Sequence, residues 1–194
     1  MSEPARDARL LTIGHSNHSA EHFQRLLVQH GVEVLVDVRS WPRSRYVEWA
    51  DRSRIVEVAR MAGARYLFLG SELGGRPDGD EFYDSEGHVL YGRVARSAGF
   101  RAGLGRLRRG AERYRVAIMC SEEDPAACHR RLLVSKVLLG EGWTVDHIRG
   151  DGRCETEERP IEHAEGSLFD DEESLWRSSL SVSRRRPQKI SSAA

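Results

Sequence analysis

Short apolar runs alternate with longer amphipathic stretches between residues 10 and 150, and this alternation restricts the fold more than any other feature. Each run has the length of a β-strand and is bounded by polar residues or glycine. The runs cover residues 10–13, 32–38, 66–69, 116–119 and 144–148. Strands that alternate with helices are typical of βαβ units. We therefore expect an α/β fold with a single mostly parallel sheet of about five strands and helices on both faces, a Rossmann-like three-layer architecture.

The stretches between the runs predict four helices. In the first, Phe23, Leu26 and Leu27 recur at helical spacing, Ser19 can cap the N-terminus, and Gly31 suits the position after the C-terminus. The other helices are expected to end near residue 63, to span residues 100–114, and to run from about residue 125 to residues 140–142.

The length of 194 residues suits one compact domain with an appendage. We assign residues 10–150 to the α/β domain and residues 1–9 to a flexible N-terminus. Residues 151–173 contain ten acidic residues and form an acidic extension that can dock on the domain. Residues 174–194 are rich in Ser and Arg and lack an apolar period, so we expect them to be disordered.

Charge and apolar content exclude several classes of protein. Lys plus Arg and Asp plus Glu number 30 each, so no overall field indicates a nucleic-acid or membrane partner. No apolar run approaches the roughly 18 residues of a membrane span, and the N-terminus lacks the apolar stretch of a signal peptide. Three cysteines are too few, and odd in number, for a disulfide framework. These features predict a cytoplasmic protein without a membrane partner.

Polar, reactive or glycine-rich sequence follows four of the predicted strands. Because the carboxyl ends of parallel strands meet at one edge of a sheet, we expect these segments to form one site there. They supply His15 after the first strand, Asp37, Arg39 and Arg43 at the second, Glu72, Gly74 and Arg76 after the third, and Cys120 and Glu122 at the fourth.

The segment from Cys120 to Arg130 is the most informative motif. It has a thiol at a strand end and a Cys128-His129-Arg130 triplet in the first turns of the next helix. Helix N-termini activate thiols and attract anions. We hypothesise that Cys120 is a catalytic nucleophile, and packing of a buried cysteine is the alternative.

Three further residues complete the catalytic hypothesis. His129 or His15 would move the proton of the thiol, and Glu122 would orient that histidine.

The other polar residues at this edge are candidates for support of the site and for substrate binding. Asp37 and Arg39 share one strand face and can pair with each other. Tyr91 would stack on a base or cover the long loop over residues 70–90, which is long enough to be a lid. We assign substrate binding to Asp37, Arg39, Arg43, Glu72, Gly74, Arg76, Tyr91, Cys128 and Arg130.

Metal binding is a competing use of Cys120, Cys128 and His129. Zinc favours such ligands, but no C-x-x-C pair is present, and the adjacent Cys128 and His129 should point to different helix faces. We therefore predict no cofactor and no metal ligands, and a metal ion held by these three residues is the alternative.

Leu168 and Phe169 lie in the acidic extension, within Glu165-Gly-Ser-Leu168-Phe169-Asp170. This segment resembles the short peptide with which bacterial DNA-repair proteins bind the sliding clamp, although the usual first Gln is absent. Docking of this pair on its own domain is the alternative.

With these motifs, residues 10–150 resemble the bacterial family called domain of unknown function 488. The resemblance is carried by Thr12-Ile13-Gly14-His15-Ser16, Val36-Asp37-Val38-Arg39, Leu69-Gly70-Ser71-Glu72-Leu73-Gly74-Gly75, and above all Cys120-x-Glu122-x-x-Pro125-x-x-Cys128-His129-Arg130. It implies a soluble α/β protein in which these motifs cluster, and it implies no established reaction.

These features lead to two hypotheses about function. The first is a cysteine-dependent enzyme, a transferase or a hydrolase, that acts through Cys120 on an anionic substrate such as a nucleotide or nucleic acid. The alternative is a non-catalytic binding module, either a metal or redox sensor that needs both thiols, or an adaptor of the DNA machinery recruited through its tail.

Overall fold

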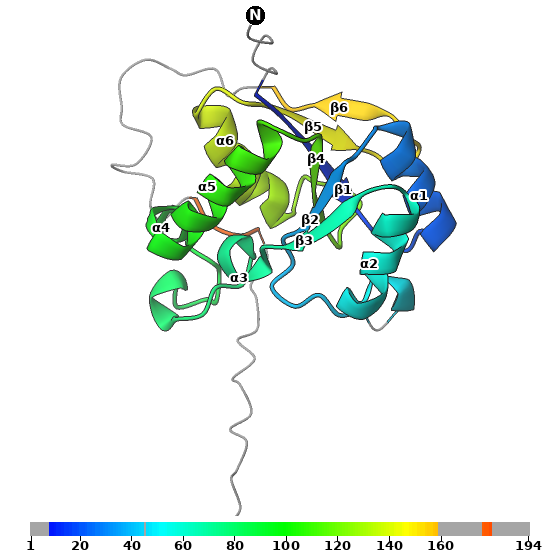
Figure 1. Cartoon of the computed structure of the whole chain (residues 1–194). Coiled ribbons are helices and arrows are strands. Elements are labelled where there is room, and N and C mark those ends of the chain that lie inside the picture. Colours follow the sequence, from blue (N-terminus) through cyan, green and yellow to red (C-terminus); the bar gives the residue numbers. More distant parts are fainter. Residues whose placement is uncertain (1–7, 45, 159–175, 180–194) are drawn as a thin grey trace, which may run out of the picture.

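The computed structural model describes residues 8–44, 46–158 and 176–179. Its centre is one sheet of six strands in the order β3-β2-β4-β1-β5-β6 (Figure 1). The strands are β1 (Arg9–Gly14), β2 (Val34–Asp37), β3 (Arg65–Phe68), β4 (Val116–Cys120), β5 (Thr144–Ile148) and β6 (Cys154–Thr156). The first five strands are parallel, and β6 runs antiparallel to β5. The predicted mostly parallel α/β sheet is therefore confirmed, with one strand more than expected.

The additional strand lies beyond residue 150, where we expected the domain to end. Residues 149–153 turn the chain back, and Cys154 pairs with Ile148. All three residues of β6 are exposed, so β6 has no apolar run by which the sequence could reveal it.

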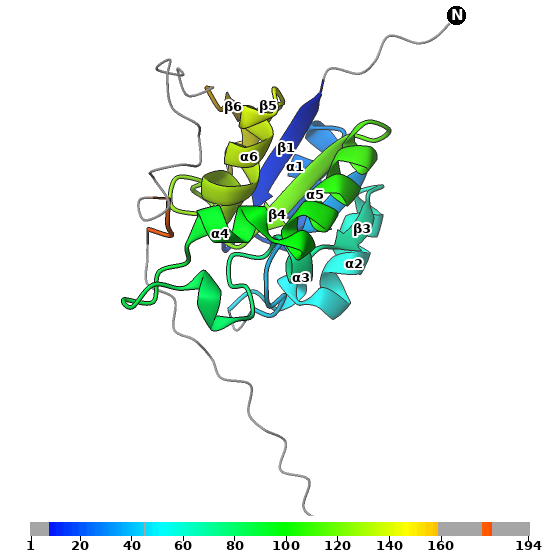
Figure 2. The same ribbon diagram turned by 90° about the vertical axis from the view of Figure 1, so that its left-hand side faces the viewer.

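Helices cover both faces of the sheet, as predicted (Figures 1 and 2). The helices α1 (Ala20–Gln29) and α2 (Arg52–Met61) pack on one face, against side chains such as Leu11, Ile13 and Leu35. The opposite face is covered by α3 (Gly70–Leu73), α4 (Tyr91–Arg96), α5 (Ala98–Ala111), the π-helix η3 (Arg130–Ser135) and α6 (Lys136–Gly140). Two short 3₁₀ turns are η1 (Glu48–Ala50) and η2 (Asp80–Phe82). None of the described helices is both long and apolar enough to cross a membrane.

Local sequence signals place the ends of α1 correctly. The Ser19 side chain accepts a hydrogen bond from the His22 backbone N–H at 3.2 Å, and Gly31 has a φ of 59°, which glycine adopts without strain.

The fourth predicted helix begins later than expected, because residues 125–128 form a turn. Its first part is a π-helix, in which the Ser135 hydroxyl donates to the Arg130 carbonyl at 2.7 Å.

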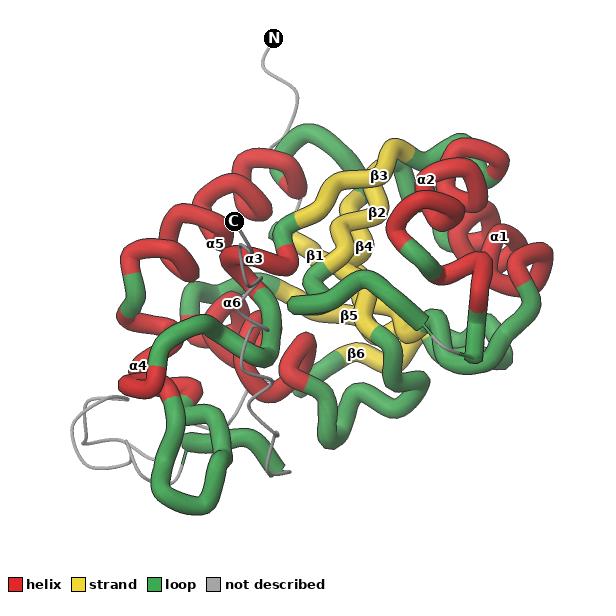
Figure 3. The backbone as a smooth tube through the Cα atoms, turned by 90° about the horizontal axis from the view of Figure 1, so that it is seen from below, coloured by secondary structure: helices red, strands yellow, loops and turns green. Residues whose placement is uncertain are grey.

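The carboxyl ends of β2, β4 and β1 are neighbours, because these strands lie side by side in the middle of the sheet. Figure 3 views the molecule from the side of these ends and shows loops crossing in front of the strands. The central position of β4 places Cys120 between the ends of β1 and β2, with Cys120 in register with Gly14.

The predicted 70–90 loop contains α3, η2 and a bridge between Tyr83 and Val89. Residues 176–179, which we expected to be disordered, pair with its end. The backbone N–H of Tyr91 donates to the Trp176 carbonyl at 2.9 Å, and that of Ser178 donates to the Val89 carbonyl at 2.9 Å. The rest of the predicted tail, the Leu168-Phe169 pair and residues 1–7 lie outside the described residues.

Candidate functional site

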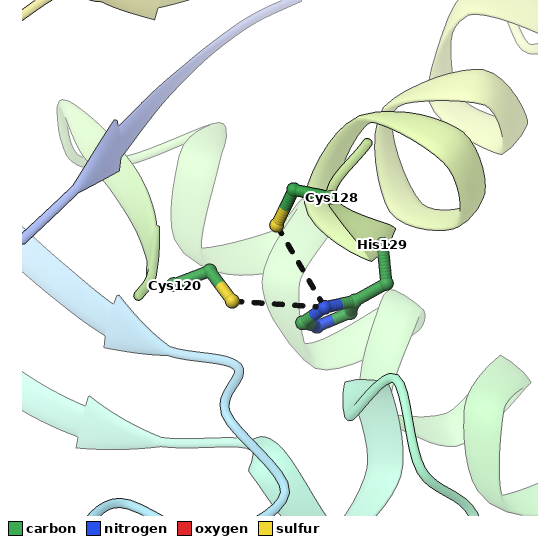
Figure 4. A group of neighbouring side chains, drawn as sticks. All are labelled: Cys120, Cys128 and His129. Atoms are coloured by element: carbon green, nitrogen blue, oxygen red, sulfur yellow. Dashed lines mark hydrogen bonds between the residues drawn. The ribbon is translucent and has the colours of Figure 1, made fainter. Parts of the chain in front are cut away.

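Two thiols and an imidazole converge at the carboxyl end of β4 (Figure 4). The Nδ1 atom of His129 lies 3.7 Å from the Cys120 sulfur and 3.9 Å from the Cys128 sulfur. One ligand atom from each of the three residues lies within 4.8 Å of the others. The expectation that Cys128 and His129 point apart is wrong, because both residues precede the regular part of the helix and their side chains can turn to the same point.

The Glu122 carboxylate contacts both thiols. Its Oε2 atom accepts from the Cys120 thiol at 3.0 Å and from the Cys128 thiol at 3.2 Å. Burial of the carboxyl opposes its ionisation, but the hydrogen bonds from Cys120, from its own backbone and from Cys128 outweigh this effect and hold the pKa of Glu122 below its ordinary value. As a residue Glu122 is exposed, although its carboxylate contacts two buried thiols.

The two thiols are not equivalent in their environment. The hydrogen bond between Cys128 and Cys120, followed by burial, raises the pKa of the Cys128 thiol well above its ordinary value. Cys128 is only 2% exposed and Cys120 is 5% exposed. Both effects favour the protonated form of the Cys128 thiol.

The loop that carries Glu122 is fixed by contacts from both sides. A Cβ atom on Gly14 would lie 1.8 Å from the Glu122 carbonyl oxygen, so only glycine lets the loop pass over β1. Arg130 is fully buried and donates to the carbonyls of Glu122 and, at 2.7 Å, of Glu123. Arg130 was predicted to bind substrate, but its guanidinium points to this loop and supports it.

The His129 ring is held from its far side. Its Nε2 atom donates to the Val38 carbonyl at 3.0 Å, which leaves the Nδ1 lone pair of the neutral ring facing the two sulfurs. The ring lies against Gly75, where a Cβ atom would approach His129 Cγ to 2.6 Å. Burial lowers the pKa of His129, but contacts with Cys128, Glu122 and the Val38 carbonyl raise it above its ordinary value overall.

Beside the thiols, Asp37 and Arg39 form a buried ion pair. Arg39 donates to Asp37 from Nε at 2.9 Å and from Nη2 at 2.7 Å, and Nη2 also donates to the Ala50 carbonyl at 2.8 Å. The Tyr66 hydroxyl donates to the same carboxylate at 2.8 Å. Both charged residues are under 5% exposed, so this pair supports the ends of the strands and does not face open solvent.

His15 joins this network rather than the thiol cluster. Its Nδ1 donates to the Ser16 carbonyl at 2.8 Å, and its Nε2 accepts from Arg39 Nη1 at 3.2 Å. Burial, and then the charge of Arg39, lower the pKa of His15 to about 4. Since both ring nitrogens are engaged, the histidine that contacts the thiols is His129.

The remaining predicted residues lie in three different environments. Tyr91 is buried, and its pKa is raised by burial and then by the charges of Cys128, Cys120 and Glu122, so its ring borders the cluster. Glu72 pairs with Arg106 of α5 at 2.7 Å. A Cβ atom on Gly74 would meet the Gly70 carbonyl oxygen at 2.3 Å, so here the close approach is made by the protein's own backbone. Arg43 and Arg76 are exposed.

Two contributors to the cluster were not predicted. The Val38 carbonyl orients His129, and Gly75 provides the surface on which that ring packs. From the sequence, the Gly74-Gly75 pair suggests close approach of the backbone to a ligand, whereas in the structure the group next to Gly75 is the His129 ring.

A cavity of about 580 Å³ lies beside Glu123 and the β5–β6 hairpin, away from the two thiols. Its charged side chains pair with one another. Glu123 contacts Arg149 at 2.9 Å, and Asp151 contacts Arg153 at 2.6 Å. These pairs make the cavity a poor place for an anionic ligand.

The fold and the cluster define an α/β protein with a Cys-Cys-His-Glu group at the carboxyl edge of its sheet. A comparison with protein families matches residues 19–137 to the family described as Domain of unknown function DUF488. The match covers more than half of the chain and includes the whole segment from Cys120 to Arg130, so the chain belongs to this family. Searches of curated proteins and of solved structures returned no significant match.

Proposed function

We propose that this protein is a metal-dependent enzyme that acts on an anionic substrate at the carboxyl edge of its sheet. A zinc-like ion would be held by the sulfurs of Cys120 and Cys128 and by Nδ1 of His129. The observation that carries this proposal is the convergence of these three ligand atoms within 4.8 Å of one another.

The distances suit tetrahedral coordination. Bonds of about 2.3 Å to sulfur and about 2.1 Å to nitrogen put sulfur and nitrogen ligands about 3.6 Å apart around zinc. The corresponding distances here are 3.7 and 3.9 Å. Soft thiolate ligands favour zinc-class ions over magnesium or calcium.

The environment of His129 also supports a metal ion. Histidines that bind metals nearly always donate their second ring N–H to a carbonyl or carboxylate, which fixes the ring and directs the other lone pair to the metal. Nε2 of His129 donates to the Val38 carbonyl in this way.

Three protein ligands would leave room at such an ion for water or substrate. The Glu122 carboxylate lies next to both sulfurs, and the residue is exposed. We infer that Glu122 would be the proton acceptor of the site, and that an ion held there would supply Lewis-acid activation of water or substrate. The exposed Arg43 and Arg76 would attract the anionic group.

A thiol enzyme without metal is the second candidate function. Cys120 contacts both Glu122 and His129, which are groups that can accept its proton. Its low exposure of 5% disfavours direct attack on a bulky electrophile, so we place this candidate second.

Metal analysis combined with thiol titration against pH separates the two candidates. The proteins are wild type, Cys120→Ser, Cys128→Ser and, as a matched control, Cys154→Ser, which removes the exposed cysteine outside the cluster. We expect close to one equivalent of metal in wild type and in Cys154→Ser, and a loss of metal in the other two variants.

The titration decides the case in which metal is absent. If wild type holds no metal even after equilibration with Zn²⁺, the metal proposal is wrong. A thiol that then reacts readily at neutral pH and vanishes in Cys120→Ser would favour the nucleophile, whereas an unreactive Cys120 would make the cluster a packing feature.

A further inference from the structure

We propose that Trp41, Arg43 and Arg76 form a binding surface for single-stranded nucleic acid, in which a base stacks on the Trp41 ring and the two arginines contact phosphates. We name these three residues the Trp41 surface. The inference deepens the proposed function and rests on it, because it names the substrate class that would reach the Cys120-His129 cluster.

The Trp41 surface is built from two segments that meet at the carboxyl edge of the sheet. Trp41 follows β2 and is 47% exposed, and Arg76 follows α3 with its guanidinium carbon 5.3 Å from the centre of a Trp41 ring. The backbone N–H of Arg76 donates to the Ser40 hydroxyl at 2.9 Å, which joins the two segments.

This surface adjoins the cluster. Gly75, the residue before Arg76, lies directly against the His129 ring. Ser40, the residue before Trp41, is within contact distance of the neighbouring Gly74. A strand that stacked on Trp41 would therefore pass close to the position proposed for the metal ion.

The exposed aromatic side chains favour stacking with bases. Large rings are usually buried, yet Tyr46 on the same segment is 95% exposed and Trp41 is half-exposed. Every base has a π-face, so aromatic platforms bind single strands with little dependence on sequence. The guanidinium beside the indole adds a cation–π contact and a positive charge.

The arginines of this surface are not paired with carboxylates in the part of the chain that the structure describes. Within the described residues, neither Arg43 nor Arg76 forms an ion pair with a carboxylate, and Glu48 on the same segment pairs with Arg54 at 2.7 Å. Arg52 lies over the Phe68 ring at 4.3 Å and is also exposed. The net charge of the chain is zero, so the attraction of phosphates is local to this surface.

The shape of the surface favours a single strand over a free nucleotide or a duplex. Small-ligand sites are concave and bury most of the ligand, whereas Trp41 and Tyr46 are exposed. Proteins that recognise duplex DNA usually place a helix or a β-ribbon in a groove, and residues 40–44 and 46–47 are irregular. An exposed ring with a guanidinium beside it is typical of single-strand binding.

Fluorescence anisotropy with a labelled single-stranded oligonucleotide of about ten nucleotides tests the proposal, with titrations at several salt concentrations. The proteins are wild type, Trp41→Leu, Trp41→Tyr, Arg43→Ala and, as a matched charge control, Arg101→Ala on the exposed side of α5. Thermal unfolding of each variant checks that it is folded.

Each variant has a distinct expected result. Trp41→Leu should weaken binding about tenfold or more, and Trp41→Tyr should keep most of the affinity because it keeps a ring. Arg43→Ala should reduce the slope of log K against log salt by about 0.7, the loss of one phosphate contact. Arg101→Ala should change neither quantity. Equal binding by folded Trp41→Leu and wild type, preference for a duplex, or full competition by a mononucleotide would overturn the proposal.

Repeating the titration with Cys120→Ser separates this inference from the metal proposal. Loss of metal with unchanged oligonucleotide binding would support both, since the surface and the ion are held by different residues. Oligonucleotide binding by a wild type that cannot take up metal would refute only the metal proposal. Metal uptake without oligonucleotide binding would refute only the Trp41 surface.

Discussion

His15 illustrates how much of the site depends on single buried residues. It is 4% exposed, and both of its ring nitrogens are hydrogen-bonded in the neutral form. A protonated ring would have to donate from Nε2 toward the Arg39 guanidinium, which is itself positively charged. The fold therefore stabilises neutral His15.

This burial predicts that stability decreases at acidic pH. Burial and the Arg39 charge lower the pKa of His15 from 6.5 to about 4. Between these values the unfolded chain binds more protons than the folded chain, so the free energy of unfolding falls as pH is lowered. His15 contributes roughly 3 kcal/mol to this loss. Urea unfolding of wild type and His15→Gln at several pH values should show a flatter curve for the variant, and parallel curves would contradict the prediction.

Two glycines offer a matched pair for the loop that carries Glu122. Gly14→Ala would place a methyl group against the Glu122 carbonyl and should reduce stability by about 3 kcal/mol, because backbone atoms must move. Gly99→Ala in α5 meets nothing within 4 Å and should raise stability by up to about 1 kcal/mol, since alanine favours the helix. Chemical denaturation measures both changes. Equal effects would mean that the loop does not need Gly14.

At the scale of elements, the segment between β4 and η3 determines the geometry of the cluster. Sequence patterns located this segment and its functional residue types. They placed the helix start too early, because residues 125–128 are held as a turn by the Cys128 N–H bond to the Pro125 carbonyl at 3.0 Å. Helix ends of this kind depend on contacts that periodicity does not record.

Substitution of Arg130 tests whether the buried guanidinium of this residue holds the segment between β4 and η3 in place. Arg130→Met keeps a long side chain but removes the donors to the Glu122 and Glu123 carbonyls. We expect a loss of about 3 kcal/mol in unfolding free energy and weaker uptake of Zn²⁺, because Glu122 and Cys128 lose their common support. Arg131→Met, in the next position and half-buried, is the control. Unchanged stability in Arg130→Met would show that the loop is held elsewhere.

At the scale of the whole molecule, residues 176–179 link the end of the described chain to the α/β domain. The Trp176 indole N–H donates to the Leu132 carbonyl at 2.7 Å, and Lys136 lies 4.6 Å from its ring. The same segment pairs with residues 89–91, next to Tyr91 at the thiol cluster. Its removal should therefore affect both the stability of the domain and the position of Tyr91.

Trp176→Ala tests this link in the full chain. The side chain is partly buried against the helical face that contains α4 and α6, so we expect a loss of about 2 kcal/mol. For a chain of this size that loss corresponds to a decrease in Tm of about 4–8 °C. Trp41→Ala, which removes an exposed indole, should leave Tm nearly unchanged. A Trp176→Ala protein with wild-type Tm would show that this contact is not stabilising.

The sequence by itself determined the α/β class, most strands, the capping of α1 and the motif from Cys120 to Arg130. These features are set by local periodicity and by residue types a few positions apart. The exposed strand β6 and the docked residues 176–179 lack such local signals.

Only the tertiary structure decided which predicted residues act together. The His129 ring is oriented by the Val38 carbonyl, 91 positions away in the sequence. The Arg39 guanidinium donates hydrogen bonds to His15 and to the Ala50 carbonyl, which belong to two other segments. The Arg130 guanidinium donates its hydrogen bonds to the carbonyls of Glu122 and Glu123 in the loop that carries Glu122. The partners of a side chain depend on the order in which strands pair, and the order that places β4 between β1 and β2 is a property of the whole sheet.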